Sequence, residues 1–163
     1  MFSKGEYVVY GNHGVCYVED ITYLNMPGSD TERLYYVLRP TNAKGSTVYS
    51  PTDNVRVPLR TVMTTEEAQE VLEEMPQIHE AEVANERFRE ETYKEIMKSC
   101  DFRQIAGLTK LLVKRRKQRL KQGRKFTSLD ERYLKASDDF LSSELSQALG
   151  ESKRSVISIW DGE

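Results

Sequence analysis

Basic side chains in the second half of the chain are the first residues whose type and spacing could do chemistry. From Phe102 to Leu129 the sequence contains ten Lys or Arg residues and no Asp or Glu. Like charges four residues apart destabilise a helix by about 0.2–0.5 kcal/mol per pair. No carboxylate inside the run relieves this repulsion, which favours phosphate groups as the partner. Phosphate contacts bind nucleic acid with a steep dependence on salt and with little sequence preference.

A helix over this run would collect several cations on one face. At about 100° per residue, spacings of four, three and four place four lysines in one narrow arc. An apolar stripe that contains Ile105, Leu108 and Leu112 lies roughly opposite and is expected to be buried. Arginines and the last lysine of the run widen the charged surface beyond the arc. The DNA contacts predicted on this segment are Lys110, Lys114, Arg116, Lys117, Lys121, Arg124 and Lys125.

The distribution of charge also points to a local anionic partner. The whole chain has a formal net charge of only −2, but the balance is −5 from Met1 to Met75 and +3 from Pro76 to Glu163. A solvated helix without a partner and a helix that binds an acidic protein are alternatives that remain open. A membrane surface is disfavoured, because the apolar stripe lacks Trp and Phe and is needed for packing.

The sequence contains no pattern typical of an enzyme or a metal site. Neither His13 nor His79 is spaced with other potential ligands, and Cys16 and Cys100 form no CxxC unit. Phosphate-binding glycine loops and the G-x-S-x-G and H-E-x-x-H motifs are missing. We therefore predict a non-enzymatic protein without cofactor, metal or small-molecule substrate. An active site that the sequence does not reveal is the alternative.

The N-terminal residues and the hydropathy of the chain predict a cytoplasmic protein. The start, Met1 to Glu6, becomes polar at once and is not followed by the apolar segment of a signal peptide. No segment approaches the ~18 apolar residues that would span a bilayer, so no membrane contact is expected.

The first sixty residues have the composition and spacing of short β-strands. Turn residues separate the segments, as in the polar loop from Asn25 to Asp30. Five short strands at this spacing predict a small β-barrel of the SH3 or Tudor kind. The predicted strands are Tyr7–Tyr10, Val15–Leu24, Leu34–Leu38, Thr47–Tyr49 and Val55–Val57.

Helix signals begin at Thr64 and continue to the end of the chain. The capping boxes Thr64-x-x-Glu67 and Ser128-x-x-Glu131 predict two helix starts, and Asp101 is expected to cap a third helix. The only Trp, Trp160, lies among apolar residues and is expected to anchor a last short helix. The predicted helices cover residues 64–75, 85–99, 101–123, 128–150 and 152–160. The fold class is therefore α+β, with a small β-barrel followed by a compact helical domain.

The order of these segments resembles that of a known family. The strings G-E-Y-V-V-Y-G-N-H-G-V (residues 5–15), L-Y-Y-V-L-R (34–39) and T-V-Y-S-P (47–51) resemble the RNA-polymerase-interacting domain shared by CarD/CdnL regulators and transcription-repair coupling factor. The segment N-x-R-F-R-E-E-T-Y-K-E-I-M-K-S-C-D (85–101) and I-A-G-L-T-K-L-L (105–112) resemble the helical domain of the CarD/CdnL proteins. The ordered set, rather than any single motif, carries the resemblance over nearly the whole chain.

The resemblance implies a bacterial transcription regulator. Residues 1–62 would be a Tudor-like domain that docks on the β-subunit lobe of bacterial RNA polymerase, and residues 63–83 a helix and linker. Residues 84–163 would be a helical domain that contacts promoter DNA at the upstream edge of the bubble and helps to hold the open complex. Such proteins are not enzymes and need no metal. An adaptor that binds polymerase or another protein without touching DNA is the alternative.

The sequence departs from the family pattern at positions that matter for both contacts. Glu86 stands where family members have a Trp that wedges against the opened minor groove, and Phe88 is the candidate apolar substitute. Arg89 matches a basic family position, so Phe88 and Arg89 join the predicted DNA contacts. The predicted polymerase contacts are Tyr23, Leu24 and Tyr49, of which the last two stand near family Arg positions.

Overall fold

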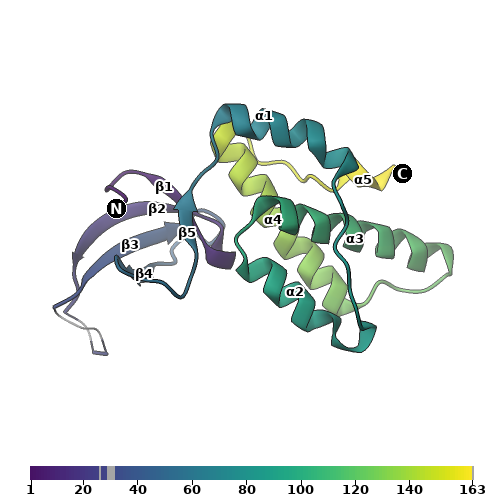
Figure 1. Ribbon diagram of the computed structural model, residues 1–163, viewed down its shortest axis with the longest axis horizontal. Coiled ribbons are helices and arrows are strands. Elements are labelled where there is room, and N and C mark those ends of the chain that lie inside the picture. Colours follow the sequence, from purple (N-terminus) through teal and green to yellow (C-terminus); the bar gives the residue numbers. More distant parts are fainter. Residues whose placement is uncertain (26, 29–31, 163) are drawn as a thin grey trace.

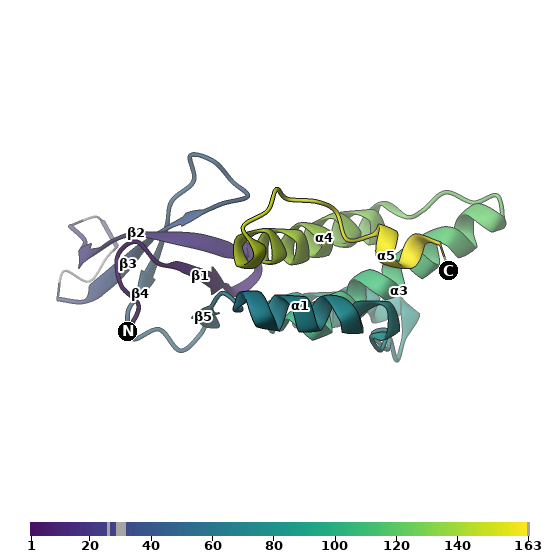
Figure 2. The same ribbon diagram turned by 90° about the horizontal axis from the view of Figure 1, so that it is seen from above.

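A sheet forms one end of the elongated molecule and the helices form the other (Figures 1 and 2). The computed structural model describes residues 1–25, 27–28 and 32–162, so the loop predicted from Asn25 to Asp30 lies partly outside the described residues. The strands are β1 (Tyr7–Tyr10), β2 (Val15–Tyr23), β3 (Leu34–Pro40), β4 (Val48–Pro51) and β5 (Leu59–Thr61). All pairs are antiparallel, in the order β4-β3-β2-β1-β5. The predicted α+β class is confirmed.

In the described residues the sheet is open, so the predicted small barrel of the SH3 or Tudor kind is not closed. β4 and β5 form its two edges, and no pairing joins them among the described residues. The predicted fifth strand, Val55–Val57, is instead part of a turn. The Asn54 side chain accepts hydrogen bonds from the backbone N–H groups of Arg56 (2.9 Å) and Val57 (3.4 Å), which favours a turn over a strand. The segment that pairs with β1 is Leu59–Thr61.

The two faces of the sheet contribute to different cores. Val9 and Val15 belong to the core of the helices. Their neighbours along the strands point to the other face, because side chains alternate along a strand. That face carries a small core of its own, made of Val8, Tyr10, Cys16, Val18, Tyr36 and Leu38. The helices therefore contact one face of the sheet where β1 and β2 carry Val9 and Val15.

Between the sheet and residue 162, the last that the structure describes, there are five α-helices. They are α1 (Thr65–Glu74), α2 (Arg89–Lys98), α3 (Phe102–Lys121), α4 (Ser128–Leu149) and α5 (Ser158–Asp161). Thr64 and Asp101 cap α1 and α3 as predicted, since their side chains accept hydrogen bonds from the third backbone N–H that follows. The cap of α4 is Thr127 rather than Ser128. Thr127 has an extended backbone and accepts from the N–H of Asp130 (3.2 Å), whereas Ser128 is already helical.

Two helices are shorter than predicted. Asn85 caps a single 3-10 turn, η3 (Glu86–Phe88), and α2 begins only after it. Near the C-terminus, the N–H of Val156 donates to the Asp138 carboxylate (2.8 Å) instead of to a helical carbonyl, so residues 152–157 are not α-helical. The prediction for Trp160 is confirmed. It is buried, and its indole N–H donates to the carbonyl of Met75 (2.8 Å) in a second 3-10 turn, η2 (Met75–Gln77).

An ion pair joins the sheet to the helices. The guanidinium of Arg60 on β5 donates two hydrogen bonds of 2.6 Å to the carboxylate of Glu144 on α4. Glu144 is completely buried and also accepts from the N–H of Met63 (2.9 Å). Arg60 donates a third hydrogen bond to the carbonyl of Cys100, between α2 and α3 (2.9 Å). Because a buried charge needs such partners, this junction holds β5, α4 and the α2–α3 turn in one arrangement.

Candidate nucleic-acid interface

The basic helix α3 is buried in its first half and accessible in its second. Nine residues between Phe102 and Val113 are buried, including the predicted stripe of Ile105, Leu108 and Leu112. From Lys114 onward no residue of the helix is buried, and this half extends beyond the other helices (Figures 1 and 2). The second half has no apolar face to pack. The helix is thus anchored in the core at one end and presents its cations at the other.

Several cations of α3 have carboxylate partners on distant segments of the chain. Lys114 pairs with Glu80 (3.3 Å), Arg115 with Glu86, and Arg116 with Asp161 (3.4 Å). Arg103 pairs with Glu74 in the same way (2.9 Å). The interpretation that the repulsion in the run is unrelieved is therefore wrong for this part of it. The run has no acidic residue of its own, but the fold supplies carboxylates that are separated from it by 29 to 45 positions.

Residues 78–85, which we call the strap, bring one of these carboxylates to α3. The strap crosses α3 on its way from α1 to η3 (Figure 1). The N–H of Ala81 donates to the carbonyl of Gly107 (3.0 Å), and a Cβ atom at Gly107 would lie 2.6 Å from the carbonyl oxygen of His79. The ammonium of Lys110 donates to the carbonyls of Pro76 (3.2 Å) and Ile78 (2.9 Å). Gly107 therefore permits the close approach that places Glu80 beside Lys114.

The end of α3 and the turn after it carry three exposed cations that form no ion pair with a described residue. We call Lys121, Arg124 and Lys125 the tip. All three are exposed, and in the described part of the chain their side chains form no ion pair. The turn is held by Arg119, whose guanidinium donates to the carbonyl of Lys125 (2.6 Å). Gly123 has a φ of +69°, a conformation that glycine adopts without strain.

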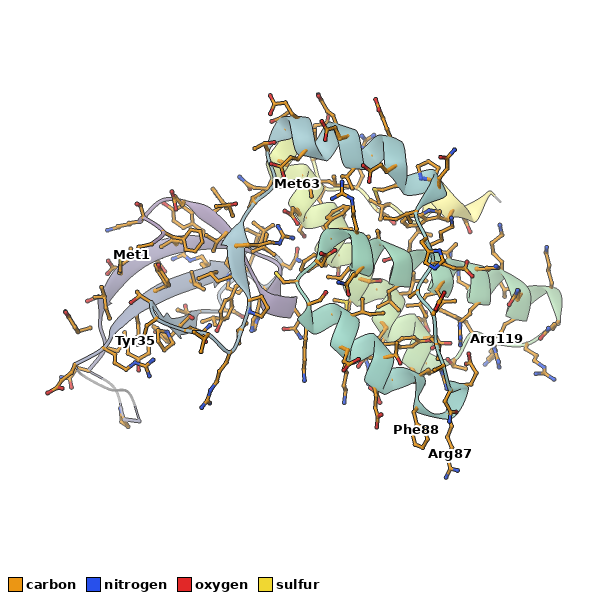
Figure 3. The ribbon with its side chains drawn as sticks, in the orientation of Figure 1. Met1, Tyr35, Met63, Arg87, Phe88 and Arg119 are labelled. Atoms are coloured by element: carbon orange, nitrogen blue, oxygen red, sulfur yellow. The ribbon has the colours of Figure 1, made fainter. Side chains whose placement is uncertain are left out.

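Phe88 and Arg87 form an exposed corner at the start of α2. The Phe88 side chain is 50% exposed, and the Arg87 guanidinium lies 5.7 Å from the centre of its ring. Both side chains point away from the helices (Figure 3). Glu86 points to α3 instead, where the hydrogen bonds from Arg115 lower the pKa of its carboxyl below its ordinary value. Phe88 is thus the accessible apolar group of η3.

Arg89 lies in a wall rather than on a free surface. Its guanidinium donates to the buried carboxylate of Asp130 (3.1 Å), which also accepts from the hydroxyl of Tyr93 (2.9 Å). Burial raises the pKa of the Tyr93 hydroxyl above its ordinary value, and the hydrogen bond to the Asp130 carboxylate raises it further. Arg89, Arg115 and Arg119 line a groove of about 600 Å³ between η3 and the end of α3. Its lining also includes Glu86 of η3 and Gln122, the residue after α3.

Two of the predicted polymerase contacts, Tyr23 and Tyr49, lie on β2 and β4, and Leu24 directly follows β2. Tyr23 ends β2 and pairs with Leu34, and Tyr49 on β4 pairs with Val37. Side chains alternate, so this register places Tyr49 and Tyr23 on different faces of the sheet. Both tyrosines are exposed, whereas Leu24 is half-buried. Tyr35, in the same hairpin, marks this end of the molecule in Figure 3.

A comparison with known protein families accounts for the sheet. Residues 2–63 match the family model of the CarD-like/TRCF RID domain. The chain contains a CarD-like RID domain. A comparison with curated proteins finds no match. The RID domain is an RNA-polymerase-interacting domain of the CarD/TRCF type, and it acts through protein contacts rather than by catalysis.

The RID domain and the cationic surface occupy separate parts of the chain. The match ends at residue 63, so α3, the strap and the tip lie outside it.

Among the described His, Cys, Asp and Glu residues, no group of three is placed to hold a metal ion. Every helix within residues 1–25, 27–28 and 32–162 is too short or too polar to cross a membrane.

Sequence reasoning missed the residues that compensate charge around α3. Glu80 and Glu86 pair with Lys114 and Arg115 of α3, but neither carboxylate lies within the basic segment from Phe102 to Leu129. One signal was available for the strap: a glycine in the middle of an apolar helix, here Gly107, often marks a close approach of another segment. No local pattern identifies Asp161 as the partner of Arg116, because tertiary packing brings them together.

Proposed function

We propose that this protein is a CarD-like transcription regulator that bridges bacterial RNA polymerase and promoter DNA. Residues 1–62 dock on the polymerase β subunit, residues 63–83 form a helix and linker, and residues 84–163 contact promoter DNA. The two contacts together stabilise the open promoter complex. The RID match supports the polymerase contact, and the observation that carries the DNA contact is the unpaired, exposed tip of α3.

The structure favours an uneven division of the DNA contact among the predicted residues. Lys121, Arg124 and Lys125 supply the main phosphate contacts, because their charges have no carboxylate beside them in the described residues. Lys110, Lys114 and Arg116 contribute less, since each already donates to protein oxygens. Lys117 lies one turn before Lys121, and Phe88 is the apolar group that inserts beside opened bases.

Weak backbone contacts suffice in this proposal because polymerase holds the protein near the DNA. A tethered second contact forms at a high effective concentration, which raises overall affinity without any new interaction. The tip therefore needs to bind isolated DNA only weakly.

Charge reversal at the tip tests the DNA contact. We expect Lys121→Glu/Arg124→Glu/Lys125→Glu in the full chain to weaken binding to a promoter duplex at least about tenfold at low salt. The loss of three phosphate contacts also lowers the slope of log K against log salt by about 2 to 3. Fluorescence anisotropy at several salt concentrations measures both quantities.

The control removes equal charge elsewhere. Lys4, Lys44 and Lys98 are exposed and lie outside the tip, so Lys4→Glu/Lys44→Glu/Lys98→Glu should keep most of the DNA affinity and the salt slope. If both triple variants lose affinity equally, the binding is a property of net charge and the tip has no special role.

Polymerase docking is tested on the opposite end of the molecule. Tyr23→Ala/Tyr49→Ala should weaken binding of the full chain to RNA polymerase, whereas Tyr7→Ala/Val55→Ala, which also truncates two exposed apolar side chains of the RID domain, should not. Equal binding by both double variants would place the docking surface elsewhere.

The adaptor without DNA contact is the second candidate. The pairing of Lys114, Arg115 and Arg116 within the protein supports it, because this pairing leaves a smaller free cationic surface than the sequence indicates. An adaptor would bind polymerase normally when the tip is reversed, and polymerase–promoter complexes would not respond to that change.

A further inference from the structure

A second groove lies beside α3, on the face that carries the predicted row of lysines. It has a volume of about 430 Å³, and its walls include Lys110, Lys114, Lys117, Lys121, Glu80 and Trp160. Four ammonium groups and one carboxylate give this lining a formal charge of +3. At about 100° per residue, its direction on α3 is roughly a quarter turn away from the groove that Arg115 and Arg119 line. We call it the lysine groove.

The lysine side chains at the two ends of the lysine groove differ in how firmly they are held. Lys110 is half-buried, and its ammonium is held by the carbonyls of Pro76 and Ile78, so its charge has a fixed position. An ammonium has three donors, and these two carbonyls leave one free. Lys121, eleven residues later, is exposed. At ~1.5 Å per residue the row extends over about 16 Å of helix, which suits a linear anion rather than a compact one.

Glu80 and Trp160 give the groove a rim and a floor. The Glu80 carboxylate pairs with Lys114 at 3.3 Å, the position at which an anionic oxygen of a ligand would be bound. Trp160 is fixed by its hydrogen bond to Met75 and packs in the core below the lysines. The groove therefore has cations held on a rigid base, with a protein carboxylate in competition for one of them.

We propose that the lysine groove binds a linear polyphosphate anion, and that Glu80 lowers its affinity by competing for Lys114. A chain of phosphates is thin enough to lie along the groove and dense enough in charge to meet several ammonium groups. A DNA duplex presents a broader surface, and the exposed tip is the part of α3 that meets it. The site shares Lys121 with the tip, whereas Arg124 and Lys125 do not line the groove.

The only Trp of the chain lines the groove, so its fluorescence reports on the site directly. Titration of the full chain with sodium triphosphate at low salt should give a saturable change in Trp160 emission, and calorimetry should give the same affinity. Lys117→Gln/Lys121→Gln should weaken binding about fivefold or more. Glu80→Gln should strengthen it about threefold, a gain that misfolding does not produce. Glu82→Gln, on the same strap but outside the groove, should leave it unchanged.

A second pair of variants separates this site from the part of the tip that lies outside the groove. Arg124→Gln/Lys125→Gln removes the same charge outside the groove, and should change triphosphate affinity less than twofold while it weakens duplex binding. Absence of saturable triphosphate binding, or equal effects of the two pairs on it, would overturn the proposal. So would a duplex that displaces triphosphate and loses as much affinity as triphosphate does when Lys117 alone is changed to Gln, since the groove would then hold DNA phosphates. Failure of the duplex to bind at all would instead count against the proposed function, and the triphosphate result would stand.

Discussion

Glu86 has a physical role different from that of the Trp expected at its position. Where the resemblance leads one to expect a Trp, this chain has a carboxylate that accepts hydrogen bonds from Arg115. The bond fastens η3 to α3 and turns the neighbouring Phe88 outward. Position and residue type could be read from the sequence, but the partner of Glu86 could not, because Arg115 is 29 positions away. The apolar group available at this corner is consequently Phe88.

Truncation of Phe88 tests its role in the open complex. The side chain is half exposed, so we expect Phe88→Ala to leave the unfolding free energy within about 0.5 kcal/mol of the parent. The lifetime of open promoter complexes in the presence of polymerase should fall about threefold or more. Val55→Ala, at a 95% exposed site of the RID domain, is the control. An unchanged lifetime with Phe88→Ala would remove this residue from the DNA contact.

The Glu86–Arg115 pair should also respond to pH. A carboxylate with a lowered pKa in the folded state adds stability above its unfolded pKa and loses it as pH falls through the folded pKa. NMR titration should therefore give Glu86 a midpoint below the ordinary value of about 4.3. The effect on stability is below about 1 kcal/mol, because Glu86 is largely exposed. Arg115→Gln should return the midpoint toward the ordinary value; if it does not, Arg115 is not the cause.

At the scale of elements, local signals predicted four strands and the starts of α1, α3 and α4, but they misplaced the fifth strand and started α2 and α5 too early. Thr64 and Asp101 cap helices because their side chains bond to backbone groups three residues away, an interaction that the sequence itself displays. The fifth strand was misplaced because Asn54 competes for the backbone of Val55–Val57. The open sheet could not be predicted from strand spacing, since closure depends on which edges meet. The sequence pattern predicts only a linker at the strap, because the contacts of the strap with α3 are tertiary.

Gly107 is the position where the strap is most sensitive to substitution. A Cβ atom there would lie 2.6 Å from the carbonyl oxygen of His79, so Gly107→Ala must push the strap away from α3. We expect a loss of about 1–3 kcal/mol in the free energy of unfolding, measured with urea. Gly162→Ala, where no atom would meet the new methyl group, is the control. Unchanged stability in Gly107→Ala would mean that the strap moves freely.

At the scale of the whole molecule, the RID domain and the helices share more than a linker. Val9 and Val15 of the sheet lie in the helical core, and Arg60 meets Glu144 at the buried junction. Removal of the helices would expose these valines and leave Arg60 without its partner. The sequence predicted two parts correctly in type, but the junction joins residues 84 positions apart and has no local pattern. Studies of polymerase binding are therefore best made with the full chain.

Loss of one partner at the junction should be costly. Arg60→Ala leaves the Glu144 carboxylate buried without its cation, and we expect about 3–5 kcal/mol lower stability. In the parent protein the sheet and the helices should unfold in a single transition, so the tyrosine and tryptophan fluorescence should change together. Arg39→Ala, which removes an exposed pair with Glu19, should cost less than about 1 kcal/mol. Similar losses for the two variants would show that the junction is not the main link.

The buried junction also gives the molecule a fixed length. The hairpin end of the RID domain and the tip of α3 lie at opposite ends of the chain's long axis (Figures 1 and 2). The hydrogen bonds between Arg60 and Glu144 join the sheet to α4, so they oppose a hinge motion that would change the distance between the two ends. In the proposed bridge the length of the protein therefore sets the distance between the polymerase surface and the DNA. One added turn of α3 would increase that distance by about 5.4 Å.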